Sequence, residues 1–277
     1  MRELISIVIP CFNDEEYIEK AVASALKQEA VYVEVIVIDD GSDQRTKKVL
    51  NSLISDGIKL ITQENKGQAA ARNRGIEAAT SAYIVVLDSD DSFEKEFCIK
   101  ALKQFQKSTI TRLVTCGAIL HYEDGTEKIF NPKGGHLDDF LFSNSALGNC
   151  SMFRKEDWKL VGGYDESMRS GWEDWEFYIR LMQLGGHCIV IPEPLFHYNK
   201  RKGTTTARAN KLKYELWEYI LTKHEALYKQ HYKALVDFFL MQLEHEEQEK
   251  IKNTKRIDFM IGKTVLSPLR VIKKLWK

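Results

Sequence analysis

Two patterns of apolar residues alternate along the first hundred positions of the chain. Short apolar runs rich in β-branched residues have the composition of strands that are buried on both faces. Between them, apolar residues recur every three or four positions, as they do on one face of a helix. The predicted strands are 4–9, 33–38, 58–62 and 83–87, and the predicted helices lie near 17–26, 49–54, 67–79 and 94–107. This alternation predicts an α/β fold with a doubly wound, mostly parallel sheet.

The pattern changes beyond residue 112. Longer apolar runs at 113–122 and 126–130 flank an Asp-Gly pair, which predicts a β-hairpin in a mixed α+β half. Residues 211–252 have a charged, helical pattern, and residues 256–277 combine aliphatic side chains with six basic residues and one acid. We therefore expect a helical C-terminal extension that ends in a basic amphipathic tail.

Overall composition excludes several classes of protein. The 40 basic residues balance the 40 acidic ones, so no global field favours nucleic acid as a partner. The five cysteines are scattered without a C-x-x-C pair, which is typical of a reducing cytoplasm. No apolar run is long enough for a signal sequence or a transmembrane helix, so we expect a cytoplasmic protein that does not span a membrane.

Three aspartates, Asp88, Asp90 and Asp91, directly follow the predicted strand 83–87. Like charges this close repel each other unless a cation lies among them. One of them could cap the next helix, but that would leave the other two unexplained. Mn²⁺ or Mg²⁺, completed by phosphate oxygens of a substrate, would account for all three, so we favour a metal site.

The polar residues that follow the other predicted strands point to the same edge of the sheet. Parallel strands gather their carboxyl ends there, and the first two strands end in "PCFND" and "DDGSD". Asp40 could accept a hydrogen bond from a ring N–H of a base, and Lys66 and Arg72 add positive charge, although they could equally be solvated. The first turn lacks G-x-G-x-x-G, and the chain lacks a P-loop, which argues against dinucleotide oxidoreductases and ordinary P-loop NTPases.

Six ordered stretches resemble the motifs of family 2 glycosyltransferases with the GT-A fold. They read VIPCFNDE, IDDGS, NKGQAAARNRGI, VLDSDD, VGGYDE and WEDWEFYIRL, and they occupy residues 8–15, 38–42, 65–76, 86–91, 161–166 and 172–181. The resemblance implies an inverting enzyme that moves a sugar from a nucleoside diphosphate donor, most often UDP-linked, to a hydroxyl of a glycan or lipid-linked glycan. Synthesis of a cell-surface polysaccharide is the process that it implies.

The resemblance also implies roles for individual residues. Pro10, Phe12 and Asn13 match the loop beside the nucleotide, and Asp40 matches the acid that binds the base. Asp88 matches the residue near the ribose, and Asp90 matches the principal metal ligand, with Asp91 in support. Asp174, which follows Glu173, matches the general base. The helical pattern independently places Asp174 beside Phe177 and Tyr178, where partial desolvation would raise its pKa. Alternatively, Glu173 and Asp174 only stabilise the first turn of a helix.

Residues 198–204 depart from the family pattern. A Y-R-x-H-x-x-S segment is expected there, and Arg201 stands at the position of the histidine. Cations at 200–202 could still neutralise a leaving phosphate, and Gly203 with the following threonines suits a lid. We nominate Gly148, Asn149 and Trp172 as acceptor-lining residues.

We expect a glycosyltransferase domain over residues 1–207, with a nucleotide-binding half (1–111) and an acceptor half (112–207), and the helical extension over 208–277. The tail, 256–277, suits either the anionic inner face of a membrane or packing on protein, which leaves both peripheral membrane contact and a homodimer open. A nucleotidyltransferase and a catalytically inactive nucleotide-sugar-binding protein are the alternative functions.

Overall fold

The computed structural model describes residues 2–201, 205–256, 259 and 261. The chain divides into two compact units, residues 1–222 and residues 223–277. The first unit contains the sheet and its helices, and the second is helical.

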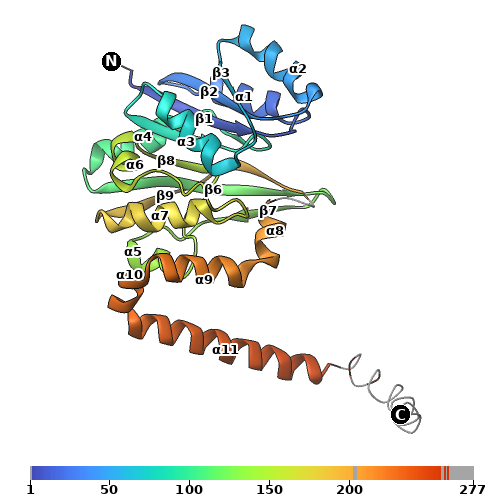
Figure 1. The fold of residues 1–277 in the computed structure, drawn as a ribbon, viewed down its shortest axis with the longest axis vertical. Helices are drawn as coiled ribbons and strands as arrows, with labels where there is room; N and C mark the ends of the chain where they lie inside the picture. The colour runs from blue at the N-terminus through green and yellow to red at the C-terminus, as the bar shows by residue number, and fades with distance from the viewer. Residues whose placement is uncertain (1, 202–204, 257–258, 260, 262–277) are drawn as a thin grey trace. The chain divides into compact units, whose positions relative to one another are not determined.

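One mixed sheet forms the centre of the first unit (Figure 1). Its strands lie in the order β3-β2-β1-β4-β8-β6-β9-β5, and β7 pairs with β6. Their bounds are β1 Leu4–Cys11, β2 Tyr32–Asp40, β3 Lys59–Gln63, β4 Tyr83–Leu87, β5 Ser92–Phe93, β6 Thr111–Tyr122, β7 Glu127–Phe130, β8 Cys150–Arg154 and β9 His187–Lys200. The four strands β3, β2, β1 and β4 are parallel, whereas β8 runs antiparallel to both β4 and β6.

Helices cover both faces of this sheet. Those of the first unit are α1 Ile18–Leu26, α2 Gln44–Leu53, the 3-10 turn η1 Ile54–Asp56, α3 Gln68–Ala78, α4 Phe97–Lys107, α5 Leu137–Phe140, α6 Lys155–Val161, α7 Glu173–Gln183, α8 Thr205–Lys211 and α9 Lys213–Lys223. Alternate residues of β1, among them Ile7, belong to a core cluster with Ile18 of α1 and Phe97 of α4. On the opposite face α3 lies so close that a Cβ at Gly75 would be 2.4 Å from Val8. Glycine at position 75 therefore lets the helix approach the strand.

The predicted α/β fold with a mostly parallel sheet is confirmed, and so is the hairpin between β6 and β7. Asn13, which precedes α1, does not cap that helix. Its side chain instead accepts a hydrogen bond from the Asp43 backbone N–H at 2.8 Å, and its own φ is +57°. The apolar pattern also gave no signal for β8, which inserts between the two halves of the sheet.

The second unit contains α10 Glu225–Gln230 and α11 Tyr232–Thr254. None of the α11 residues is buried. Over the described residues, no helix combines the length and the apolar character that a membrane crossing requires. The predicted basic tail, 256–277, lies outside the described residues apart from positions 256, 259 and 261.

Candidate active site

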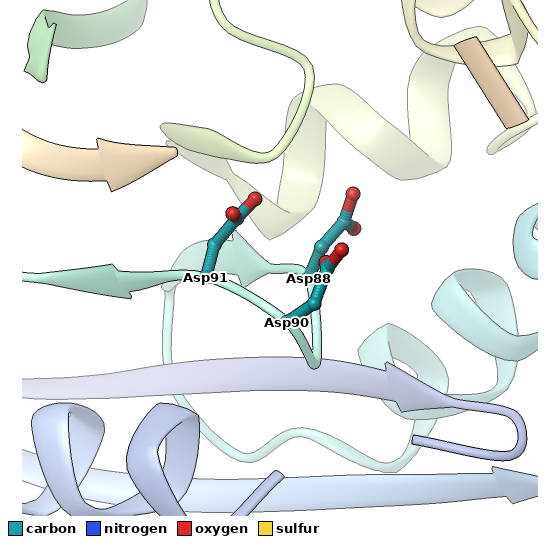
Figure 2. A group of neighbouring side chains, drawn as sticks. All are labelled: Asp88, Asp90 and Asp91. Carbon is teal, nitrogen blue, oxygen red and sulfur yellow. The ribbon is translucent and has the colours of Figure 1, made fainter. Parts of the chain in front are cut away.

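The three aspartates occupy the turn after β4, at the carboxyl edge of the parallel strands (Figure 2). One oxygen of each lies within 4.8 Å of the others. In Figure 2 the carboxylates of Asp88 and Asp90 lie close to each other, and that of Asp91 points the same way from the neighbouring position. The rigid end of a buried strand thus presents a compact group of carboxylates.

Asp91 is held firmly by residues from the second half of the chain. It is buried, Oδ1 accepts from the Asn199 backbone N–H at 2.9 Å, and Oδ2 accepts from Asn149 Nδ2 at 2.5 Å. Burial and the neighbouring Asp90 raise its pKa well above the ordinary value. Both oxygens already have donors, so Asp91 supports the turn that carries the other two aspartates.

Asp90 faces the side chain of Arg201. The guanidinium donates from Nη2 and, at 3.0 Å, from Nε to Oδ2 of Asp90. Nη2 also lies 3.2 Å from Asp14, whose other oxygen accepts from Ser89 at 2.5 Å. Burial first, and then the charge of Asp88, raise the pKa of Asp90 to about 6, and the charge of Arg201 opposes this shift.

The carboxylate oxygens of this turn fit a hard divalent cation. Oδ2 of Asp88 and Oδ1 of Asp90 have no hydrogen-bond partner in the part of the chain that the structure describes. Carboxylate oxygens are the ligands that Mg²⁺ and Mn²⁺ prefer, and both ions commonly keep positions for phosphate oxygens and water. Asp88 and Asp90 would hold such an ion.

Arg72 of α3 connects this turn to α7. Nη2 donates to Asp88 at 2.8 Å and Nη1 to Glu173 at 2.7 Å, and the guanidinium lies 5.4 Å from the centroid of the Tyr164 ring. Arg72 and Glu173 are both buried. Burial raises the pKa of Glu173 to about 7 even though the Arg72 charge opposes this shift. The buried network fixes the start of α7 against the acidic turn.

Asp174, the next residue of α7, contacts the segment between α5 and β8. Its Oδ2 accepts from Asn144 Nδ2 at 2.8 Å, and a Cβ at Gly148 would lie only 1.7 Å from the same oxygen. Burial is the largest cause of an upward shift in its pKa. A half-buried carboxylate with one amide donor and a raised pKa can accept a proton from a hydroxyl group.

Asp40 anchors the loop that precedes α3. Oδ1 accepts from Gln63 Nε2 and the Lys66 backbone N–H, and Oδ2 accepts from the Gly67 backbone N–H, at 2.8, 2.9 and 2.8 Å. Gly67 has a φ of +92°, which favours glycine. The Lys66 side chain itself is exposed, so this residue contributes its backbone to the site.

Two adjoining clefts open on these residues. The acidic cleft, of about 570 Å³, is lined by Pro10, Phe12, Asp14, Asp40, Asp88, Asp90, Arg169 and Arg201 among others. The aromatic cleft, of about 630 Å³, is lined by Tyr122, Phe130, Phe142, Asn144, Gly148, Asn149, Trp172, Asp174, Lys200 and Trp217 among others. Both include Gln68, Asp88, Glu173 and Tyr198, so the two clefts meet beside the acidic turn.

Most of the predicted site residues line one of these clefts, and three do not. Asn13, Lys66 and Asp91 lie outside both linings, whereas Arg72 lines the aromatic cleft and is paired with Asp88 and Glu173. Of the segment 203–206, for which we expect a lid, residues 203 and 204 lie outside the described residues, and α8 begins at Thr205.

Several lining residues escaped the sequence analysis. Arg169 donates to the Asn65 side chain at 2.9 Å across the acidic cleft. Trp217 of α9 packs edge-on against Trp172 and Trp175, with ring centroids 6.2 and 4.8 Å apart. For Asn144 the only signal was its place in a polar stretch shortly before Gly148, and for Trp217 there was none, because it comes from a segment that we assigned to the extension.

The family described as Glycosyl transferase family 2 matches residues 6–161, more than half of the 277-residue chain. The chain belongs to this family. A second family, described as the N-terminal domain of galactosyltransferase, matches residues 137–220. The resemblance seen in the six sequence motifs is therefore confirmed.

Relatives of this family 2 glycosyltransferase include a much longer synthase and a second glycosyltransferase. It is 30% identical over 194 residues to the chondroitin synthase of Pasteurella multocida, a match over 66% of this chain but only 19% of the synthase. It is 30% identical over 228 residues to Glycosyltransferase GlyG of Streptococcus pneumoniae, over 74% of this chain and 73% of that protein. The chain thus spans about a fifth of the synthase.

Solved structures of similar fold include enzymes with bound donors. Staphylococcus aureus TarS 1-349 in complex with UDP-GlcNAc matches with a TM-score of 0.61 and 20% identity, over 75% of this chain and 61% of that one. Mannosyltransferase PcManGT from Pyrobaculum calidifontis, in complex with GDP-Man and Mn²⁺, matches with a TM-score of 0.60 and 17% identity, over 75% and 60%. At these identities the likeness is one of fold, and it identifies the sheet and its helices as a GT-A glycosyltransferase fold.

Proposed function

We propose that this protein is an inverting glycosyltransferase that moves a sugar from a nucleoside diphosphate donor, UDP-linked in the first instance, to a hydroxyl of a glycan or lipid-linked glycan. The observation that carries the proposal is the meeting of the two clefts. The acidic cleft offers carboxylates for a cation and a diphosphate, and the aromatic cleft offers Asp174. Both contain Glu173 and Asp88, so a donor and an acceptor would meet there.

In this proposal Asp174 takes the proton of the acceptor hydroxyl. The acceptor oxygen then attacks the anomeric carbon from the face opposite the diphosphate, which inverts the configuration of the sugar. Asn144 orients the carboxylate, and Arg72 keeps the neighbouring Glu173 fixed. When bound at Asp88 and Asp90, a divalent cation would offset the charge of the diphosphate.

Arg201 would assist departure of the nucleoside diphosphate. Its guanidinium already lies in the acidic cleft between Asp90 and Asp14, and a guanidinium binds phosphate oxygens with a matching pair of donors. Pro10, Phe12 and Asp40 would contact the nucleotide, and Gly148, Asn149 and Trp172 the acceptor.

The setting that we propose is cell-surface polysaccharide synthesis at the inner face of the cytoplasmic membrane. Support comes from relatives whose names place them in teichuronic acid and succinoglycan biosynthesis. The basic sequence at 256–277 would supply the membrane contact, and a homodimer is the alternative use of that segment.

Calorimetric titration tests the donor site. The protein is titrated with UDP, GDP, TDP, CDP and ATP, each with Mn²⁺ and with a chelator. The same titrations use Asp90→Ala and, as a matched control, Asp56→Ala at an exposed position of η1. We expect one nucleoside diphosphate to bind only with Mn²⁺, and only Asp90→Ala to abolish that binding. Binding of ATP alone would favour a nucleotidyltransferase, and diphosphate binding without sugar transfer to any acceptor would favour an inactive binding protein.

A further inference from the structure

One face of the sheet forms a wall of the aromatic cleft. Strand register places Leu120 of β6 opposite Tyr198 of β9 and Lys128 of β7, and places Tyr122 opposite Lys200. Because side chains alternate between the two faces of a strand, these five residues lie on one face. All of them except Lys128 line the aromatic cleft.

Lys200 is an unusual residue for such a wall. It is half-buried, and its Nζ lies 4.1 Å from the centroid of the Tyr198 ring. In the part of the chain that the structure describes, no carboxylate lies within 4.0 Å of this ammonium group. Burial lowers the pKa of Lys200, and the charge of Asp91 opposes this shift. Folding therefore partly desolvates the Lys200 ammonium group without placing a carboxylate in contact with it.

The carboxylates nearest to this cleft are already engaged. Both Asp91 oxygens accept hydrogen bonds from Asn149 and Asn199, and Asp88 and Glu173 share the Arg72 guanidinium. Asp174 accepts from Asn144. Lys200 thus remains available for an anion that enters the cleft from outside.

A second cation extends the same face toward solvent. The Nζ of Lys128, an exposed residue, lies 5.6 Å from the centroid of the Tyr122 ring. Each lysine therefore lies against an aromatic ring of the cleft wall. Aromatic rings pack against the apolar faces of sugars, whereas ammonium groups bind carboxylate or phosphate oxygens.

We propose that the acceptor is an acidic glycan, whose carboxylate or phosphate binds Lys200 while its sugar ring packs in the aromatic cleft. Lys128 adds attraction at the rim. This inference rests on the proposed function, because it assigns the chemical class of the second substrate of the same site. Lys200 is a specificity-determining residue in this proposal, and the proton transfer remains with Asp174.

Matched ligand pairs test the proposal and separate its two sources of negative charge. 4-Nitrophenyl β-glucuronide is compared with 4-nitrophenyl β-glucoside for a carboxylate, and glucose 1-phosphate with methyl glucoside for a phosphate. Ligand-observed NMR titration measures the dissociation constants with and without UDP and Mn²⁺. The proteins are the full chain and its Lys200→Gln, Lys200→Arg and Lys128→Gln variants, with Lys103→Gln on exposed α4 surface as a control for net charge.

We expect the unmodified protein to bind the acidic member of at least one pair about tenfold more tightly. Lys200→Gln should remove that preference, Lys128→Gln should reduce it, and Lys200→Arg and Lys103→Gln should keep it. Equal binding of both members, binding of neither, or a preference that survives Lys200→Gln would overturn the proposal. The UDP titration in the same samples reports on the proposed function separately. A protein that binds UDP without discriminating the pairs would retain that function and lose only the acidic acceptor.

Discussion

Arg201 contacts the same carboxylate oxygen of Asp90 through both Nε and Nη2. The two residues are 111 positions apart in the chain, and β9 carries Arg201 back to the turn after β4. The guanidinium of Arg201 therefore binds the carboxylate to which we assign a divalent ion. A divalent ion at the other oxygen of Asp90 would repel this guanidinium, for which the phosphate oxygens of the diphosphate would be alternative partners.

We predict opposite effects of Arg201→Gln on the two ligands of the acidic cleft. Without the competing guanidinium, Mn²⁺ should bind the free protein several-fold more tightly. UDP should bind the Mn²⁺-loaded protein roughly 10- to 100-fold more weakly, because a charge-assisted hydrogen bond contributes about 1.5–3 kcal/mol. Electron paramagnetic resonance measures free Mn²⁺, and calorimetry measures UDP binding. Arg74→Gln, on the exposed side of α3, is the control, and equal loss of both affinities would contradict the exchange of partners.

The Asn144 hydrogen bond predicts a shift in the pH dependence of transfer. An amide donor stabilises the ionised form of Asp174, so Asn144→Leu should raise the pKa of Asp174 further. Because the base must be ionised, the acid limb of the pH–kcat profile should move to higher pH. Asp174→Asn should lower kcat by about 10²- to 10⁴-fold at pH values above the acid limb and leave UDP binding nearly unchanged. Lost UDP binding in Asp174→Asn would instead assign this residue to the donor site.

We predict that substitution of Arg72 has a large and pH-dependent effect on stability. Arg72→Met leaves Asp88 and buried Glu173 without their cation, which should reduce the free energy of unfolding by about 3–5 kcal/mol near pH 8. The Arg72 charge lowers the pKa of Glu173, which is already raised from 4.5 to about 7, so its removal raises that pKa further. A raised pKa in the folded state stabilises the fold below the unfolded value and loses that effect as the pH rises through the folded value. The deficit should therefore shrink as the pH falls from 8 to about 7, below which Glu173 is protonated in the folded state of both proteins.

Urea unfolding between pH 5 and pH 8 measures this deficit. The double variant Arg72→Met/Glu173→Gln, which removes one of the two unpaired carboxylates, should recover part of the stability. A deficit that is independent of pH and unchanged in the double variant would assign the role of Arg72 to packing against Tyr164.

The sequence predicted the parts of the site that depend on local pattern. Buried strands such as β4 and the acidic turn behind it could be located because strand ends of a parallel sheet share one edge, and Asp88, Asp90 and Asp91 adjoin such an end. The role of Asp91 was harder to predict. Only the positions of β8 and β9 beside this turn show that its oxygens are bound by Asn149, just before β8, and by Asn199 of β9.

The aromatic cleft could be predicted least, because it depends on contacts distant in sequence. β8 and β9 carry weaker patterns than the parallel strands, so the sequence did not indicate that Tyr198 and Lys200 lie beside Tyr122. Trp217 comes from α9, beyond the predicted end of the catalytic domain. That boundary stays a prediction, although Trp217 lines the aromatic cleft and its helix belongs mostly to the unit of residues 1–222.

Gly148 provides the sharpest steric test of the base assignment. An added Cβ would lie 1.7 Å from Oδ2 and 2.9 Å from Cβ of Asp174, so Gly148→Ala must push that carboxylate away. Misplacement of a base by about 1 Å can cost roughly 10²-fold in rate. We expect kcat to fall about that far while UDP binding with Mn²⁺ stays within twofold, because the acidic cleft does not include Gly148. A second variant, Gly148→Ala/Asp174→Asn, should be no slower than Asp174→Asn alone, since the displaced group is already inactive. Additive losses in the double variant would show that Gly148 acts on the acceptor directly and not through Asp174.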